Sequence, residues 1–293
     1  KRANRFVTKF DVLARSRYYL DHLVPLWDIL LPEERGQFYI LESLLSNYKE
    51  KRVDQVWAYK DDGFCGENPV ITASYGDAVR AADSLPGRHV VLMEHGVGLT
   101  FGKAAYADGL GQRSRFSLMP VPSDYVKARV HPDLQLIPHP VVGFPKMDKW
   151  VGYGDRRIAN KSPIVAFAFH HGDKNSRPAE IGSAWEHYVT HFPELMKNYR
   201  VVAHFHPSSS VVRSPIFAAL GVEIVPDFDW IMENADVLAN DCGSAAYEFA
   251  VTGKPVILLN APWFDHKSNW GIRFWEYSNI GPQIEEPFAL ERA

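Results

Sequence analysis

Short apolar runs alternate along this chain with segments whose apolar residues recur every three or four positions. Such runs are typical of buried strands, and the periodic segments are typical of amphipathic helices. The predicted strands cover residues 38–41, 70–73, 89–93, 164–169, 201–205, 222–225, 235–239 and 256–259. The predicted helices cover residues 12–30, 43–51, 77–84, 180–192, 216–220 and 231–234, with a further short helix after Ser244. This alternation predicts an α/β protein with doubly wound parallel sheets.

A proline-rich segment, residues 130–150, separates two such α/β series. A chain of 293 residues is long for one core, so two domains are expected. We predict a Rossmann-like acceptor domain over residues 1–145 and a Rossmann-like nucleotide-donor domain over residues 146–293, with a ligand cleft at the carboxyl ends of both sheets. Aromatic residues between 263 and 277 predict a final helix that returns to the N-terminal domain, with stacking on a sugar or base as the alternative.

Composition and charge narrow the class of protein. Hydrophobic residues make up 46% of the chain and the formal net charge is −3, so no basic surface dominates and nucleic acid is an unsupported partner. Cys65 and Cys242 fit no metal or redox spacing, which favours reduced thiols in a cytoplasmic protein. No apolar run reaches the ~18–20 residues that span a bilayer, and the N-terminus has no signal-peptide core, so no transmembrane segment is expected.

The stretch DCGSAAYEFAVTGKP, residues 241–255, follows a predicted strand and begins a helix. Free backbone N–H groups, the Ser244 hydroxyl and the close approach that Gly243 permits together suit a phosphate or diphosphate. Glu248, one turn later, is placed to reach ribose hydroxyls. The alternative is an ordinary helix cap by Asp241 or Ser244, with Glu248 solvated.

Histidines and cations follow two other predicted strands at the same sheet edge. His206 and Ser208 come after strand 201–205, whereas His171 and Lys174 come after strand 164–169, so all four are candidates to bind donor phosphates. The spacing of His204 and His206 also permits a metal site, although no carboxylate cluster accompanies it. A charged loop without a ligand is the alternative for Lys174.

The N-terminal half offers a candidate general base. His95 follows strand 89–93, and the glycines after it allow an acceptor to approach the backbone. The pKa of histidine suits removal of a proton from an attacking hydroxyl, and Glu94 is the second candidate. A structural histidine in a turn is the alternative.

Several short motifs, taken in order, resemble a known family. The sequence elements His95-Gly96, GFPKMD at residues 143–148, His206-Pro207, and Asp227 with residues 235–255 resemble the CDP-glycerol glycerophosphotransferase family, whose catalytic domain has the GT-B fold. The resemblance implies that His95 activates the acceptor hydroxyl and that His206 contacts the donor diphosphate. It further implies phosphate contacts for Gly243 and Ser244, a nucleotide contact for Glu248, and a loop at Asp227 and Phe228 against the base.

We therefore predict a GT-B transferase that moves a group from a nucleotide-diphosphate donor, CDP-glycerol-like, to a hydroxyl on a glycan or polyol phosphate, without a further cofactor or metal. One alternative is a nucleotide-sugar-dependent glycosyltransferase acting on a glycan or on a hydroxylated nucleic-acid base. Another is an enzyme similar to the UDP-sugar 2-epimerases. A non-catalytic nucleotide-binding module and a metallohydrolase are the alternatives from other classes.

Overall fold

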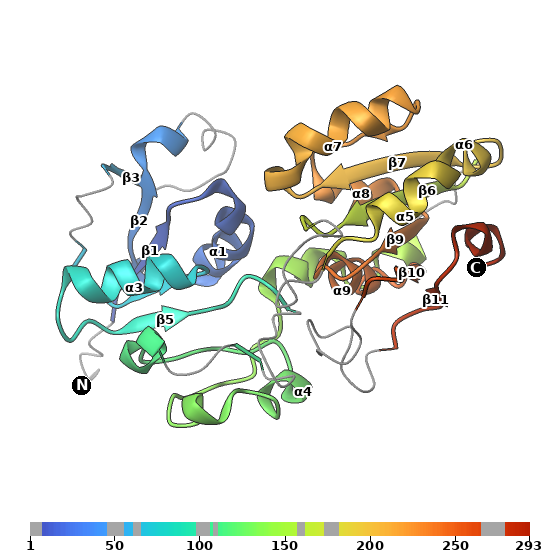
Figure 1. The fold of residues 1–293 in the computed structure, drawn as a ribbon. Helices are drawn as coiled ribbons and strands as arrows, with labels where there is room; N and C mark the ends of the chain where they lie inside the picture. Colours follow the sequence, from blue (N-terminus) through green and yellow to red (C-terminus); the bar gives the residue numbers. More distant parts are fainter. Residues whose placement is uncertain are drawn as a thin grey trace. The chain divides into compact units, whose positions relative to one another are not determined.

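The computed structural model describes residues 8–45, 56–60, 66–97, 106–107, 111–156, 162–172, 182–264 and 279–293. The chain divides into two compact units. Unit 1 comprises Lys1–Gly96 and Tyr106–Asp148, and unit 2 comprises Val97–Ala105 and Lys149–Ala293. Each unit is an α/β layer structure around one parallel sheet (Figure 1), so the predicted fold class is confirmed.

The sheet of unit 1 has the strand order β3-β2-β1-β4-β5, and its strands are parallel. Its strands are β1 (Phe10–Ala14), β2 (Arg35–Leu41), β3 (Val56–Tyr59), β4 (Val70–Thr72) and β5 (Val90–Leu92). This is the order of a Rossmann half, in which the chain changes direction across the sheet between β1 and β4. Ligands of such folds bind at the carboxyl ends of the strands beside this switch point.

Helices α1 (Arg17–Ile29), α3 (Tyr75–Ser84) and α4 (Asp124–Lys127) each begin after a serine whose side chain accepts a backbone N–H. The apolar stripe of α1 packs on β1 and β2. The core formed there contains Val12, Ala14, Leu20, Leu23, Trp27, Phe38, Ile40 and Ala73. Unit 1 also contains 3₁₀ helices at Pro32–Glu34, Glu42–Leu44, Gly111–Arg115 and Pro132–Leu134, and a further one, Pro145–Trp150, runs across the boundary between the two units.

The prediction for unit 1 is wrong at the start of one helix. Residues 12–14 belong to β1 rather than to the predicted helix 12–30, because both faces of this strand are buried and its apolar run resembles a helix stripe. Of the predicted helix 43–51, the first two residues lie in a 3₁₀ turn, Glu42–Leu44, and Leu45 is helical. Residues 46–51 lie outside the described residues, so this helix stays a prediction.

The sheet of unit 2 has the order β11-β10-β9-β6-β7-β8, again parallel. Its strands are β6 (Ile164–Phe169), β7 (Arg200–Phe205), β8 (Glu223–Ile224), β9 (Val237–Asn240), β10 (Val256–Leu259) and β11 (Gln283–Ile284). Read from β8, this is the order of a dinucleotide-binding Rossmann fold, with its switch point between β6 and β9.

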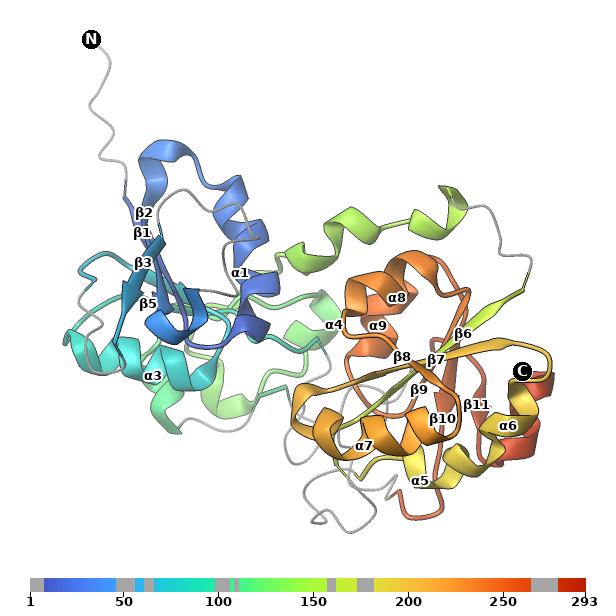
Figure 2. The same cartoon turned by 90° about the horizontal axis from the view of Figure 1, so that it is seen from above.

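Helices cover both faces of this sheet. They are α5 (Trp185–Tyr188), α6 (Phe192–Leu195), α7 (Pro207–Ala219), α8 (Phe228–Asn234) and α9 (Ala245–Ala250). Figure 2 shows α5 and α7 on one side of the sheet and α8 and α9 on the other. Phe167, Phe192 and Phe217 meet in the core under α5 and α7.

Three helices of unit 2 differ from the prediction. Residues 185–195 form α5, a 3₁₀ turn and α6 instead of one helix over 180–192. Helix α7 begins at Pro207 rather than at residue 216, because His206 caps it and proline fits its first position. Helix α8 likewise begins early, at Phe228, behind an Asp227 cap.

The final described residues belong to unit 2. Leu290 joins the core of that unit, and the Tyr188 hydroxyl donates to the Ile284 carbonyl at 2.6 Å. The 3₁₀ helix Pro287–Arg292 is therefore not the predicted returning helix. That helix was expected among residues 263–277, and residues 265–278 lie outside the described residues, so it stays a prediction. Within the described part of the chain, no helix is long and apolar enough to cross a membrane.

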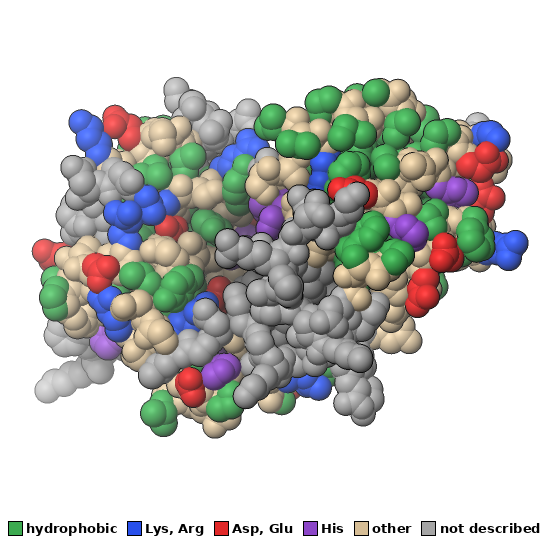
Figure 3. Space-filling model, viewed as in Figure 1, with side chains coloured by type: hydrophobic (Ala, Val, Ile, Leu, Met, Phe, Trp, Pro, Cys, Tyr) green, Lys and Arg blue, Asp and Glu red, His purple; other side chains and the backbone are tan. Residues whose placement is uncertain are grey.

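The outer surface of α7 is apolar. Val211 and Val212 are 84% and 67% exposed, and Figure 3 shows hydrophobic side chains gathered over this helix.

Candidate functional site

His95 lies three residues beyond the end of β5, at the carboxyl edge of the unit 1 sheet, and is exposed. Its Nδ1 is 3.1 Å from the Ala73 carbonyl oxygen, just beyond β4. A carbonyl oxygen only accepts hydrogen bonds, so Nδ1 must carry the proton and donate it. The neutral ring therefore keeps its lone pair on Nε2, which is the form that a general base requires.

Two side chains of α1 surround the His95 ring. The ring of Tyr19 lies 5.1 Å and that of His22 6.2 Å from it, both edge-on. His22 is 5% exposed, and burial, together with the nearby charges of Lys146 and His95, holds its pKa well below the usual value. Phe144 packs on His22 with centroids 5.4 Å apart. The GFPKMD segment thus contacts a neighbour of the candidate base. The lowered pKa keeps His22 neutral at physiological pH.

Glu94 is held in a buried ion pair. Its carboxylate accepts from Arg113 Nη2 at 2.8 Å, and both side chains are at most 5% exposed. The Arg113 guanidinium also lies over the Tyr75 ring, 4.3 Å from its centroid. Burial, and next the Glu94 charge, raise the pKa of Tyr106 well above its usual value. These contacts give Glu94 a role in fixing the turn before His95 and make it a poor partner for a solvent-borne hydroxyl.

His206 caps α7 in unit 2. Its Nδ1 lies 3.3 Å from the Ser208 backbone nitrogen and 2.7 Å from Ser208 Oγ. A backbone N–H only donates, so Nδ1 holds the lone pair and Nε2 of the neutral ring carries the proton. His206 is an exposed residue at the N-terminus of a 13-residue helix, where an N–H donor suits an anion.

Three histidines come together where β6 and β7 end. The His171 ring lies 4.0 Å from the His170 ring and 4.9 Å from the His206 ring. Burial lowers the pKa of His170 to about 4, against the opposing effect of the Asp241 charge, and the neighbouring His171, His206 and Arg213 lower it further. His170 Nδ1 accepts from the Gly172 N–H at 3.3 Å. His170 is therefore a neutral structural ring beneath the exposed His171.

Asp241 joins three segments at the switch point of unit 2. It is fully buried and accepts from the backbone N–H groups of His170, Ala184 and Cys242 at 2.7–2.9 Å, and from the Ser183 hydroxyl at 2.8 Å. These four hydrogen bonds occupy both oxygens of the Asp241 carboxylate, so the alternative that Asp241 caps α9 is wrong. Ser244 makes no side-chain cap bond either.

Gly243 and Ser244 are partly exposed at the start of α9, beside the end of β9. Glu248, however, is only 7% exposed, which differs from the solvated alternative and leaves little of it open to a ribose. Gly243 and Ser244 therefore stay candidates for the donor phosphate on position alone.

Asp227 and Phe228 serve the fold locally. Asp227 accepts from the Asp229 N–H at 3.0 Å as the cap of α8, and Phe228 packs on His204 with ring centroids 5.6 Å apart. His204 Nδ1 donates to the Val225 carbonyl at 3.0 Å. Among the described residues, no three His, Cys, Asp or Glu side chains are arranged to hold a metal ion.

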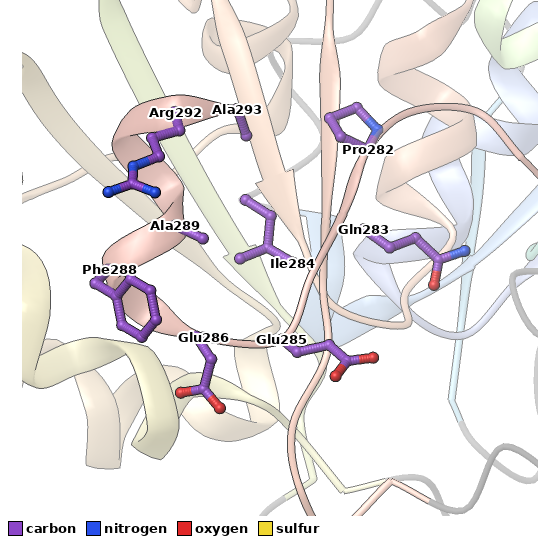
Figure 4. A pocket seen from close by; sticks show the side chains of 9 residues that line it. All are labelled: Pro282, Gln283, Ile284, Glu285, Glu286, Phe288, Ala289, Arg292 and Ala293. Carbon is purple, nitrogen blue, oxygen red and sulfur yellow. The ribbon is translucent and has the colours of Figure 1, made fainter.

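Lys174 lies outside the described residues. A separate pocket, shown in Figure 4, is lined by β11 and the residues that follow it, including Ile284, Phe288 and Arg292. None of the predicted site residues lines that pocket.

Sequence reasoning missed His22 and Arg213. His22 fits an apolar helix stripe and carries no motif. Arg213, buried on α7, contacts residues far away in the sequence. Either residue could have been identified only from knowledge of which helices and strands lie side by side in space.

Solved structures resemble this chain, whereas no family model and no curated protein matches it. A variant of the wall teichoic acid polymerase TagF is 13% identical with a TM-score of 0.62, covering 98% of this chain and 78% of that one. MurG of Acinetobacter baumannii is 12% identical with a TM-score of 0.51, covering 97% and 89%. A glycosyltransferase of Rickettsia africae is 12% identical with a TM-score of 0.50, covering 99% and 88%. At such identities the likeness establishes the fold alone, and the predicted GT-B type of α/β fold, built from two Rossmann-like units, is confirmed.

Proposed function

We propose that this protein is a transferase that moves a group from a nucleotide-diphosphate donor to an acceptor hydroxyl. Unit 2 binds the donor and unit 1 supplies the base. The observation that carries the proposal is the pair of opposite histidine tautomers. His95 presents a lone pair on Nε2, whereas His206 presents an N–H on Nε2.

In the proposed reaction the acceptor oxygen attacks the donor while His95 Nε2 takes its proton. The Ala73 carbonyl, which accepts from Nδ1, keeps the ring oriented and stabilises the imidazolium that forms. His206 Nε2–H and the N-terminus of α7 stabilise the charge that develops on the leaving nucleotide. His171, Gly243 and Ser244 are the further candidates for contacts with the donor phosphates.

The donor we favour is CDP-glycerol-like. With such a donor the acceptor oxygen attacks the phosphorus that bears glycerol, the P–O bond to CMP breaks, and a phosphodiester forms. The ordered motifs of the chain support this choice, as does its likeness to TagF, one structure of which was soaked with CDPG. The likeness to MurG supports the second candidate, attack on the anomeric carbon of a nucleotide sugar with release of a nucleoside diphosphate.

A thermal-shift screen against CMP, CDP, CDP-glycerol, UDP, UDP-glucose, UDP-GlcNAc, GDP and ADP tests the donor site. A ligand that binds only the folded state adds about 2.7 kcal/mol of stability at a hundredfold excess over its Kd. A rise selective for cytidine nucleotides supports the glycerol phosphate donor, and a rise with uridine nucleotides supports glycosyl transfer. If no nucleotide raises the melting temperature, the proposal of a donor site fails.

A product assay then tests the chemistry. The bound donor is incubated with polyol-phosphate and glycan acceptors, and the released nucleotide is identified. Release of CMP with a new phosphodiester supports the first candidate, whereas release of a nucleoside diphosphate supports the second. Tight nucleotide binding without any release, across all these acceptors, would instead favour a non-catalytic nucleotide-binding module.

A further inference from the structure

Arg213 is a buried cation on α7, the helix whose first turn His206 caps. Its side chain is 3% exposed and lies against the Trp185 ring, 5.4 Å from the centroid. Burying a guanidinium is costly unless its N–H groups are bonded, so the partners of Arg213 show what the helix gains from it.

Those partners are two backbone carbonyls of the loop after β6. Nη1 donates to the His170 carbonyl at 2.5 Å, and Nη2 donates to the Gly172 carbonyl. The planar guanidinium presents its donors in a fixed fork, so the two bonds fix the orientation of the loop as well as its distance from α7.

The same loop is held from the opposite side by Asp241. The His170 N–H donates to Asp241 Oδ1 at 2.7 Å, while the His170 carbonyl accepts from Arg213. Charged groups from two separate segments therefore secure both polar groups of residue 170. His171, the next residue, is exposed, and its ring lies 4.9 Å from the His206 ring.

We propose that Arg213 is a positioning residue of the donor site, which ties the His170–Gly172 loop to α7 and thereby sets His171 beside His206 for a shared anionic ligand. This inference rests on the proposed function, because it takes the donor diphosphate as that ligand. The charge of the guanidinium contributes in addition, since its two carbonyl partners flank His171 and a nearby cation favours an anion there.

The test is calorimetric titration of CDP and UDP into the wild type and Arg213→Lys. Lysine keeps the charge but cannot donate to two carbonyls from one plane. We expect the Kd to rise about tenfold, the scale of one lost charge-assisted hydrogen bond. Arg200→Lys is the matched control, because Arg200 lies on β7 in an exposed ion pair with Glu223, and its Kd should equal that of the wild type.

A second readout separates positioning from mere stability. Nitrogen-15 ring signals of His171 and His206 should shift in Arg213→Lys without nucleotide, whereas those of His95 should not. If Arg213→Lys does not fold, Arg213→Gln, which keeps one amide donor, replaces it. Failure of both variants to fold would assign Arg213 to the core and overturn the inference.

The outcomes distinguish this inference from the proposed function. If His206→Ala binds nucleotide as the wild type does, the donor site itself is wrong. If His206→Ala weakens binding but Arg213→Lys matches Arg200→Lys, only the role of Arg213 is overturned. If both weaken binding and Arg200→Lys does not, the positioning role is supported.

Discussion

His95 of unit 1 and His206 of unit 2 are the same residue type in similar places with opposite chemistry. Each lies just beyond a parallel strand of a Rossmann-like sheet, and each uses Nδ1 for a local hydrogen bond. His95 donates to a carbonyl, whereas His206 accepts from a backbone N–H. The other ring nitrogen, Nε2, is therefore an acceptor in His95 and a donor in His206.

The difference shows that the neighbouring backbone group, rather than the histidine, decides the role. The end of β4 supplies a carbonyl oxygen to His95, and the first turn of α7 supplies an N–H to His206. A base needs the first arrangement and an anion contact needs the second.

The largest expected effect is on turnover in unit 1. His95→Ala removes the proposed base and should lower kcat about 10²–10⁴-fold while the Kd of the donor nucleotide stays unchanged. His89→Ala is the matched control, because His89 is an exposed histidine of the same unit that contacts Ser117. Retention of most activity in His95→Ala would remove this histidine from the mechanism.

The next effect concerns the support of His95. Arg113→Ala leaves the Glu94 carboxylate buried without its cation, and the free energy of unfolding should fall by about 3–5 kcal/mol in urea titrations. Arg115→Ala removes a surface ion pair with Asp83 and an exposed hydrogen bond to Gln112 Oε1, and should cost less than about 1 kcal/mol. Equal losses in the two variants would contradict the structural role given to Glu94.

The stability of unit 2 should depend on pH through His170. Its pKa is about 4 in the folded protein and about 6.5 when unfolded, so between these values the unfolded state binds more protons. The free energy of unfolding should therefore fall as the pH drops from 6.5 to 4, by at most about 1.4 kcal/mol per pH unit from this group. His170→Gln should flatten that slope, which urea titrations at a series of pH values would measure. An unchanged slope in His170→Gln would show that His170 is not buried as a neutral ring.

The smallest effects concern the cap of α7. His206→Ala removes the Nε2–H donor and should raise the Kd of the donor nucleotide about tenfold. Ser208→Ala keeps the backbone N–H that sets the tautomer of His206, so its Kd should change by about twofold or less. A larger loss in Ser208→Ala than in His206→Ala would assign the anion contact to the hydroxyl.

Much of the fold could be predicted from sequence, because buried parallel strands are apolar on both faces. Residues 164–169 and 256–259 are apolar throughout and match β6 and β10. β11 could not be predicted, since its two residues form a strand only by pairing with β10. The same double-sided burial caused the error at β1, where strand and helix stripe merge in one apolar run.

The site could be predicted where a functional side chain comes shortly after a strand in the sequence. His95 and His206 were identified because a strand end places the next side chain at the sheet edge. Their tautomers were not, because Ala73 lies 22 residues before His95 in sequence and is brought close only by the β4–β5 pairing. The burial of Glu248 and the hub at Asp241 likewise depend on contacts between distant segments.

The most direct test is a nitrogen-15 NMR spectrum of the histidine rings, recorded at alkaline pH with and without CDP and assigned by single substitutions. We expect a protonated Nδ1 on His95 and a protonated Nε2 on His206, with CDP shifting the ring signals of His206. The same tautomer on both histidines, or a CDP response confined to His95, would contradict the division into a base in unit 1 and a donor site in unit 2.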